Sequence, residues 1–459
     1  MSKGVALLFV LIFLTASCVM AKPALSSVAV AEDTWTAKAP MQQARAGLGV
    51  VAVDGKIYAI GGNHATDYLP ISGLLGTNEE YDPETDTWTT KASMPTPRDY
   101  FAIAAYKNKI YCIGGRVGLI VDERTGFYSQ NMSGVSEVYD TATDTWETKA
   151  TMPDTGMQIQ AHVVNGKIYV MDWSYVYVYD PENDSWSSKT RMPMSYLRAS
   201  PVSAVVDGKI IVTGEFNVDS TDPDTVQKVL IYDTETDAWS GGRSGPTVVV
   251  GGAAGATTGV NAPQKVYVLG LMSKALLPTV INQVYDPQAD TWETASTLPA
   301  NRSNFGIAVV NDMLFVVGGH RRSSGYGVQP VAVNERYTPL GYGTVPPVLS
   351  VASPENRNYT SSEVALNFTV DRHAEWMGYS LDGDENVTVT GNITLTGLSN
   401  GLHNVIVYAK DEFGNTGASG TVVFSIEVPF PLVPIATASA ASIALIGVGL
   451  LVYFKKRKR

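Results

Sequence analysis

A nine-residue pattern recurs five times between residues 80 and 292 and constrains the fold more than any other feature. The copies are EYDPETDTW from residue 80, VYDTATDTW from 138, VYDPENDSW from 178, IYDTETDAW from 231 and VYDPQADTW from 284. In each copy a tyrosine precedes a tryptophan by seven residues, and aspartate, proline and threonine, which favour tight turns, lie between them. Each copy therefore predicts two short strands joined by a tight loop.

A second hairpin precedes each copy and is clearest in three places. Its sequences are VVAVDGKIYAIGG at 50–62, IAAYKNKIYCIGG at 103–115 and VVNDMLFVVGG at 309–319. Each of these ends in a glycine pair, whereas the other repeats keep only the apolar strand. Two hairpins make a repeat of four short strands, and successive tryptophans are on average about 51 residues apart.

A four-stranded repeat of this length, with a glycine pair and a spaced tyrosine and tryptophan, resembles the kelch repeat. The resemblance covers residues 28–342 and implies an all-β chain whose repeats are the blades of a β-propeller. The motif at 32–35 (EDTW) lacks a preceding tyrosine unit, and that at 334–337 (NERY) lacks a following tryptophan. If each completes the other, the N-terminal strand closes a six-bladed ring without an open sheet edge. The aromatic residues are then expected to pack between blades.

The loops after the second strand vary widely in length and are long in four repeats, whereas the third repeat has only residues 172–174. The four long loops cover residues 63–78, 116–136, 215–227 and 320–332, whereas the hairpin turns are short. In a four-stranded meander these long loops share one face with the connections between blades. Long loops on a rigid scaffold commonly bind ligands, so this face is the predicted binding face.

Arginines are the main candidates on this face. Four of them occupy the position of the family's Met-Pro-x-x-Arg motif, which is recognisable at 94–98. The kelch resemblance implies that such arginines contact peptide ligands, since their guanidinium groups suit carboxylates. The candidate contacts are Arg45, Arg98, Arg116, Arg198, Arg302, His320 and Arg321. The alternative is that the arginines hydrogen-bond loop carbonyls within the ring.

No catalytic or metal-binding constellation is evident in the sequence. The five histidines show no metal-ligand spacing, and common nucleophile, zinc-protease and P-loop motifs are absent. Cys112 occupies an apolar strand position, where a buried and inert thiol is expected. We therefore predict no metal, no cofactor and no enzymatic activity. The alternative follows from propellers that resemble galactose oxidase and sialic-acid mutarotases, which would imply a sugar-modifying enzyme with its site in the channel.

The composition changes after the repeats. Residues 348–427 contain short strands rich in valine, threonine, asparagine and leucine, which predict a β-sandwich. Residues 376–419 resemble immunoglobulin-like (Ig-like) modules of archaeal cell-surface proteins, which implies a stalk. Asn-x-Ser/Thr sequons mark candidate glycosylation sites at Asn131, Asn183, Asn301, Asn358, Asn367, Asn386 and Asn392.

The two ends resemble targeting segments. Residues 1–21 have the basic, apolar and small-residue regions of a secretory signal peptide, and Cys18 leaves a lipoprotein cleavage site as an alternative. Residues 432–454 lack charge and are long enough to cross a bilayer as a helix. The basic tail 455–459 would hold that end in the cytoplasm. We therefore expect a single-pass cell-membrane protein with its N-terminus outside and an extracellular main body.

The charge distribution narrows the class of partner. The formal net charge is -11, and residues 22–431 carry about -17, which argues against nucleic acid. We predict a cell-surface binding or adhesion module that recognises an extracellular protein or glycan. Besides the enzyme, a structural envelope component is an alternative, and the sequence predicts no oligomeric state.

Overall fold

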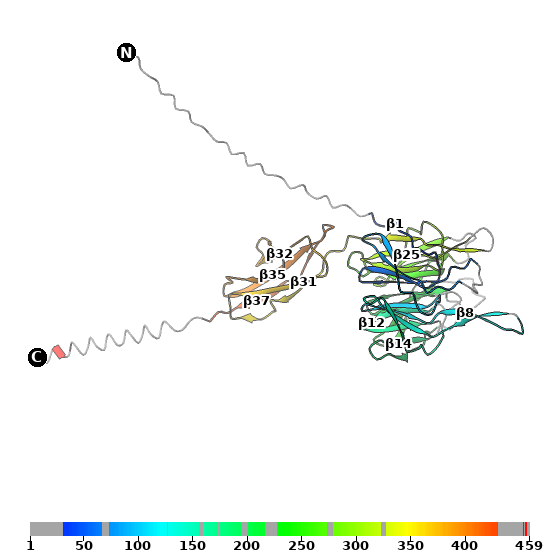
Figure 1. Cartoon of the computed structure of the whole chain (residues 1–459). Coiled ribbons are helices and arrows are strands. Elements are labelled where there is room, and N and C mark those ends of the chain that lie inside the picture. The colour runs from blue at the N-terminus through cyan, green and yellow to red at the C-terminus, as the bar shows by residue number, and fades with distance from the viewer. Residues whose placement is uncertain are drawn as a thin grey trace, which may run out of the picture.

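The computed structural model describes two units of β-strands (Figure 1). The described residues are 31–66, 73–125, 127–155, 159–172, 175–193, 201–215, 227–272, 279–322, 327–429, 453 and 455–456. Every named element in these ranges is a strand, so the predicted all-β class is confirmed.

The first unit contains six four-stranded antiparallel sheets. From the innermost strand outward, the first sheet contains β2 (Gly49–Val53), β3 (Lys56–Ile60), β4 (Asn78–Asp82) and β5 (Thr87–Lys91). The second contains β6 (Ala102–Tyr106), β7 (Lys109–Ile113), β10 (Ser136–Asp140) and β11 (Thr145–Lys149). The third contains β12 (Gln160–Val164), β13 (Lys167–Met171), β14 (Val176–Asp180) and β15 (Ser185–Ser188). The fourth contains β16 (Val202–Val206), β17 (Lys209–Glu215), β18 (Gln227–Asp233) and β19 (Ala238–Gly245). The fifth contains β20 (Val249–Ala256), β21 (Val266–Met272), β22 (Val280–Asp286) and β23 (Thr291–Ala295). The sixth contains β24 (Gly306–Val310), β25 (Met313–Val317), β28 (Asn334–Thr338) and β1 (Thr34–Lys38). Two small hairpins lie in loops, β8 (Arg116–Val121) with β9 (Tyr128–Met132) and β26 (His320–Arg322) with β27 (Val328–Pro330).

The six sheets form a closed ring. Their innermost strands contact one another in the order β2, β6, β12, β16, β20 and β24, and β24 contacts β2. The last sheet takes its outermost strand from the other end of the unit, because β1 pairs with β28 and places Trp35 opposite Tyr337. This arrangement is a β-propeller, in which closure removes the open edge between the first and last sheets.

The recurring tyrosine, aspartate and tryptophan join neighbouring sheets. The hydroxyl of Tyr81 donates to the carboxylate of Asp86 at 2.6 Å, and Asp86 accepts the backbone N–H of Ala39 at 2.9 Å. The indole N–H of Trp88 donates to the carbonyl of the same Ala39 at 2.7 Å. Equivalent contacts are made by Tyr139, Asp144 and Trp146; Tyr179, Asp184 and Trp186; Tyr232, Asp237 and Trp239; Tyr285, Asp290 and Trp292; and Tyr337, Asp33 and Trp35. The repeated nine-residue pattern therefore encodes the hydrogen bonds that join one sheet to the next, and we call each such set of tyrosine, aspartate and tryptophan a clasp.

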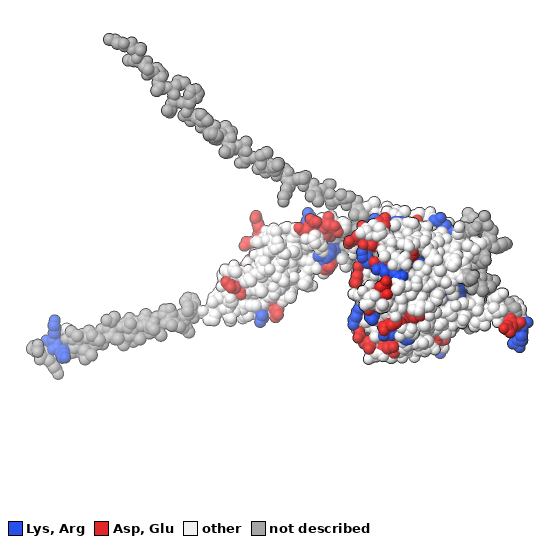
Figure 2. All heavy atoms as spheres, in the orientation of Figure 1, with Lys and Arg blue, Asp and Glu red and all other residues white. Residues whose placement is uncertain are grey.

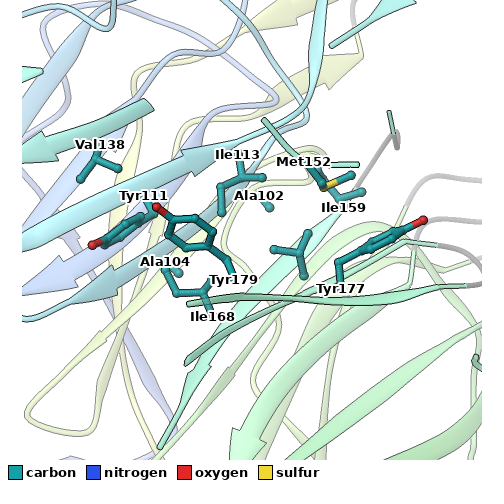
Figure 3. Packing of buried hydrophobic residues seen from close by; sticks show 11 residues of the cluster. Ala102, Ala104, Tyr111, Ile113, Val138, Met152, Ile159, Ile168, Tyr177 and Tyr179 are labelled. Carbon is teal, nitrogen blue, oxygen red and sulfur yellow. The ribbon is translucent and has the colours of Figure 1, made fainter. Parts of the chain in front are cut away.

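Apolar side chains fill the space between adjacent sheets. Figure 3 shows one cluster, in which Tyr111 and Ile113 of one sheet lie near Ile168 and Tyr179 of the next. The ring centroids of Tyr111 and Tyr179 are 5.9 Å apart. Five similar clusters lie between the other neighbouring sheets of the described propeller. Burial of these side chains is the main favourable term in holding the ring together.

The second unit consists of two packed sheets. One contains β29 (Leu349–Ser353), β31 (Val364–Val370) and β34 (Ile393–Leu395); the other contains β30 (Asn358–Tyr359), β37 (Val422–Ile426), β35 (Gly401–Lys410), β32 (Trp376–Leu381), β33 (Val387–Val389) and β36 (Thr416–Ala418). Alternate residues of β31 and β35 are buried in a shared core that includes Leu366, Val407 and Phe424. This alternation is typical of strands with one face in a core.

The two units touch at a short junction. The ring of Tyr342 packs edge-on against that of Phe413, with centroids 5.6 Å apart. The side-chain amide of Asn415 donates to the carbonyl of Gly343 at 2.8 Å, and the N–H of Gly343 donates to the carbonyl of Asn261 at 2.6 Å. Gly343 therefore bonds to both units.

The predicted localisation requires correction. We expected a single-pass cell-membrane protein, but in the described part of the chain no helix is both long enough and apolar enough to cross a membrane. The predicted signal peptide, 1–21, lies outside the described residues, as does segment 432–454 apart from Tyr453. Lys455 and Lys456 are the described residues of the basic tail.

Of the seven sequon asparagines, six are exposed and Asn131 is half-buried. Several already make hydrogen bonds: the side chain of Asn392 accepts from the N–H of Phe368 at 2.9 Å, and that of Asn301 accepts from the N–H of Val280 at 3.0 Å. In Figure 2, charged side chains of both signs gather on the side of the propeller nearest the second unit and at the tip of the element that projects on the right.

Candidate functional site

One end of the propeller gathers the long connections. Isolated bridges join Ala46 to Asn63, Asp99 to Arg116 and Ser303 to His320. Each bridge connects the segment between two sheets with the segment that follows the second strand of a sheet. We call this end, defined by these bridges, the loop face. The opposite end carries tight turns such as Asp54–Gly55 and Asn165–Gly166, whose positive φ values suit two-residue hairpins.

The glycine pairs allow these close approaches. Gly115 has a φ of 98°, and a Cβ on it would lie 2.7 Å from the carbonyl oxygen of Asp99. Gly62 is similar, with a φ of 92° and a Cβ position 2.8 Å from the carbonyl oxygen of Ala46. Only glycine fits where two backbones pass this closely at positive φ.

Three of the predicted ligand contacts are buried inside the ring. Arg45, Arg98 and Arg302 are at most 1% exposed. Arg98 pairs with Glu137 at 3.0 Å and donates to the carbonyl of Cys112 at 2.8 Å. Arg45 pairs in the same way with Glu79 and the carbonyl of Ala59, and Arg302 with Glu335 and the carbonyl of Val316.

This burial corrects the assignment of the three arginines to ligand binding. A fully buried guanidinium cannot touch a ligand on the surface, and its carboxylate and carbonyl partners match the alternative interpretation of bonding within the ring. Burial lowers the pKa of Arg45 to about 10, although Glu79 opposes this shift. The sequence did hold a signal for the pairing, because each partner glutamate stands two residues before the tyrosine of the same repeat.

The remaining candidates differ in exposure. Arg116 is also buried, at 6% exposed, and its guanidinium pairs with Asp99. His320 is half-buried and Arg321 is exposed. Arg198 lies outside the described residues. Arg116 and His320 are near enough to interact, and burial together with the charge of Arg116 lowers the pKa of His320 to about 4.

A network that the sequence did not predict is centred on Asp99. Its carboxylate accepts hydrogen bonds from Nε of Arg116 at 2.8 Å, from a second nitrogen of Arg116, and from the amide of Asn63 at 2.5 Å. The guanidinium of Arg116 also lies 5.4 Å above the ring of Tyr100. Burial raises the pKa of Asp99, and the bonds from Arg116 and Asn63 oppose that rise. This bidentate pair anchors the hairpin β8–β9 at its base.

The propeller channel contains a cavity of about 630 Å³. It is lined by the innermost strands, mostly by glycine, alanine, valine and isoleucine. Three polar side chains that contact one another interrupt this lining. Nε2 of His162 lies 2.6 Å from Oγ of Ser203, and the same oxygen lies 3.3 Å from Oε1 of Gln160. Burial lowers the pKa of His162 to about 4, so its ring is neutral near pH 7. Cavities of this size and mixed lining commonly bind small molecules.

The described residues offer no metal centre. No group of three or more histidine, cysteine, aspartate or glutamate side chains in them is placed to hold a metal ion. Cys112 is buried, and burial raises the pKa of its thiol to about 12. A thiol in such an environment is a poor nucleophile.

Comparison with known proteins matches this chain to the kelch motif family over residues 44–95 and 97–153. Kelch-like protein 26 of Danio rerio is 29% identical over 123 residues, which are 27% of this chain and 18% of that protein. The influenza virus NS1A-binding protein homolog of Mus musculus is 42% identical over 79 residues, 17% of this chain and 11% of that protein. Halomucin of Haloquadratum walsbyi is 38% identical over 112 residues, 23% of this chain and 1% of that protein. The chain therefore spans less than a fifth of each of these three relatives.

Among solved structures, that of YjhT aligns with 64% of this chain and 96% of its own, with a TM-score of 0.46 and 15% identity. The family match confirms two of the kelch repeats inferred from the sequence, at 44–95 and 97–153. These matches do not show that the second unit is Ig-like or of archaeal type, and they do not show a membrane anchor.

Proposed function

We propose that this kelch-repeat propeller is a binding module that recognises a protein ligand on its loop face. One observation carries the proposal: the long connections gather on this face and are fixed at their bases by paired backbone bridges, whereas the described turns of the opposite end are short. Rigidly based loops on a stable scaffold are a common arrangement for recognition. In this proposal the six sheets act as six blades, and the second unit, at 348–427, is a spacer of Ig-like type.

The relatives support this assignment in one respect. The mouse relative is named as a homolog of an influenza virus NS1A-binding protein, and 79 residues of this chain match it. We extend the general property, binding of a protein by kelch repeats, to the chain described here.

Site-directed photocrosslinking tests the proposal. A photoreactive amino acid in place of Arg321, which is exposed on the loop face, is expected to crosslink a protein from extract of the source cells. The same residue in place of Asn165, which is exposed in a turn of the opposite end, serves as the matched control. Protein adducts at position 165 but not at 321 would contradict the proposal. Binding to a glycan array without any protein adduct would instead assign a glycan ligand.

A second candidate function rests on the polar group in the channel. His162, Ser203 and Gln160 converge in a cavity whose lining side chains are mostly small and apolar, which suits a small ligand with a few hydrogen-bonding groups. A sugar-modifying enzyme would act here, with neutral His162 as a proton acceptor. Calorimetric titration with monosaccharides, compared between the protein and its Ser203→Ala variant, tests this function. Heat of binding that the substitution removes is the expected result, and its absence contradicts the channel as a sugar site.

A further inference from the structure

The hairpin β8–β9 projects from the loop face away from the body of the propeller (Figure 1). Its base is held by the ion pair between Arg116 and Asp99 and by two backbone hydrogen bonds between the same residues. Beyond this base, β8 and β9 form a sheet of their own that pairs with no other strand of the described chain. The hairpin is therefore a rigidly mounted element with two free edges.

Exposed apolar side chains gather on this hairpin. Ile120 is 53% exposed, Val121 49%, Phe127 77% and Tyr128 48%. In the described part of the propeller, residues 31–345, these four are the exposed large apolar side chains. Such a concentration on one projecting element marks an interaction surface, because scattered exposure is ordinary but clustered exposure is not.

The outer edge of β8 is open to another strand. Its residues 117–121, VGLIV, are apolar and largely β-branched, and they lack the lysine or proline that commonly protects an edge. The N–H of Asp122 donates to the carbonyl of Phe127, inside the hairpin. Because backbone groups alternate along a strand, the N–H groups of Leu119 and Val121 then point to the free edge. A side chain on Gly118 would meet open space, so nothing in the described chain covers this strand there.

The charges at the tip favour a protein over a bilayer. The turn that would enter a membrane first carries Asp122, Glu123 and Arg124, all exposed. Hydrogen bonds from the backbone of Arg124 and from Thr125 lower the pKa of Asp122, so the carboxylate stays ionised. Charged groups are costly to place in hydrocarbon, whereas two carboxylates against one guanidinium attract a basic partner.

We propose that the free edge of β8 binds an extended segment of a partner protein in which apolar and basic residues alternate. The partner strand extends the β8–β9 sheet by backbone hydrogen bonds to Leu119 and Val121. Its apolar side chains pack on one face of the extended sheet against Leu119 and Val121, and its basic side chains lie on the other face, the face of Ile120, where they pair with Asp122. The inference rests on the proposed function, since it specifies the partner chemistry of the same face.

Binding of a defined peptide tests the inference. The probe is a fluorescein-labelled heptapeptide of alternating leucine and lysine, titrated with the full-length protein and followed by fluorescence anisotropy. Leu119→Pro removes an N–H from the β8 edge and should weaken binding about tenfold or more, because a partner hydrogen bond is lost and the ring obstructs pairing. Gln130→Pro is the matched control. Gln130 lies opposite Leu119 on β9, so this substitution removes an N–H from the β9 edge instead of the β8 edge. It should change the affinity less than twofold.

A modified probe keeps the test independent of folding. The same heptapeptide with alternate amides N-methylated retains its charge and side chains but cannot complete the backbone ladder, so it should not bind the unaltered protein. A leucine–glutamate heptapeptide should bind more weakly than the leucine–lysine peptide.

Several results would overturn the inference. They are the absence of leucine–lysine binding, equal binding of the methylated or acidic peptide, and equal loss of affinity in both proline variants. Two further results would overturn it by favouring another occupant of the β8 edge. If the protein sedimented with phosphatidylcholine–phosphatidylglycerol vesicles and Leu119→Pro abolished this, the occupant would be a membrane. If it dimerised in analytical ultracentrifugation and Leu119→Pro abolished this, the occupant would be a second copy. Loop-face crosslinks that persist while peptide binding fails would leave the proposed function standing and reject only the hairpin as its docking strand.

Discussion

The hydroxyl of Tyr337 donates a hydrogen bond of 2.7 Å to the carboxylate of Asp33, across 304 residues of chain. Asp33 also accepts the N–H of Ser296 at 2.7 Å, and the indole of Trp35 donates to the carbonyl of Ser296 at 2.9 Å. The N-terminal segment thus fastens its own sheet to the preceding one, in the same way as every other repeat. The last clasp of the ring is the one made between opposite ends of the propeller sequence.

Asp33→Ala is expected to destabilise the whole propeller. The substitution leaves the buried hydroxyl of Tyr337 and the N–H of Ser296 without their acceptor, which should lower the free energy of unfolding by about 2–3 kcal/mol. Urea denaturation followed by tryptophan fluorescence measures this change. Asp122→Ala, in the exposed hairpin turn, is the control and should stay within about 0.5 kcal/mol of the unaltered protein. Equal stability of the two variants would show that the clasp does not hold the ring closed.

The pair of Arg98 and Glu137 should behave as a structural unit. Glu137→Leu leaves the buried guanidinium of Arg98 without its countercharge and should cost about 3–5 kcal/mol of unfolding free energy. The double variant Arg98→Met with Glu137→Leu should recover most of this loss, because it buries no unpaired charge. Denaturant titration measures both values, and leucine–lysine peptide affinity should be unchanged in the double variant. If the double variant kept full stability but lost peptide binding, Arg98 would be assigned to the ligand site instead.

Stability should fall between about pH 6.5 and pH 4 partly because of two histidines. The pKa values of His162 and His320 are about 4 in the folded chain, below the ordinary 6.5, so the unfolded chain binds more protons in this window. Stability therefore decreases as the pH falls through it. A double variant, His162→Gln with His320→Gln, should show a shallower decrease in thermal midpoint, each protein being compared with its own value at pH 8. A profile as steep as that of the unaltered protein would contradict the burial of these two rings.

Cys112 should resist thiol reagents in the native protein. Burial raises its pKa to about 12, and the thiolate that reacts is then scarce as well as inaccessible. Iodoacetamide treatment followed by mass spectrometry of the Cys112 peptide should detect modification in denaturant but little in buffer. Rapid modification in buffer would mean that the sheet around Cys112 opens readily.

Much of the fold could be predicted because its signals are local. A turn aspartate such as Asp86, the tyrosine five residues before it and the tryptophan two residues after it act within one hairpin, so a single repeat already specifies strands and loop. Recurrence of that unit then implies a ring, since each repeat leaves surfaces that only another repeat can cover.

The candidate site was less predictable because its contacts join distant segments. Arg98 lies on a connection of the loop face, yet whether it reaches outward or inward depends on Glu137, 39 residues later on another strand. The contact between His162 and Ser203 likewise exists only because β12 and β16 are neighbours in the ring.

The sequence by itself determined the repeat, the strand-and-turn chemistry and the kelch-type propeller, because these depend on side chains a few residues apart. Tertiary structure decided that Arg98 is buried against Glu137 and that the edge of β8 stays open. Burial and exposure are properties of the closed ring, and no short segment contains the partners that set them. Arg98 is therefore buried inside the ring, whereas the apolar side chain of Ile120 is exposed on a projecting hairpin.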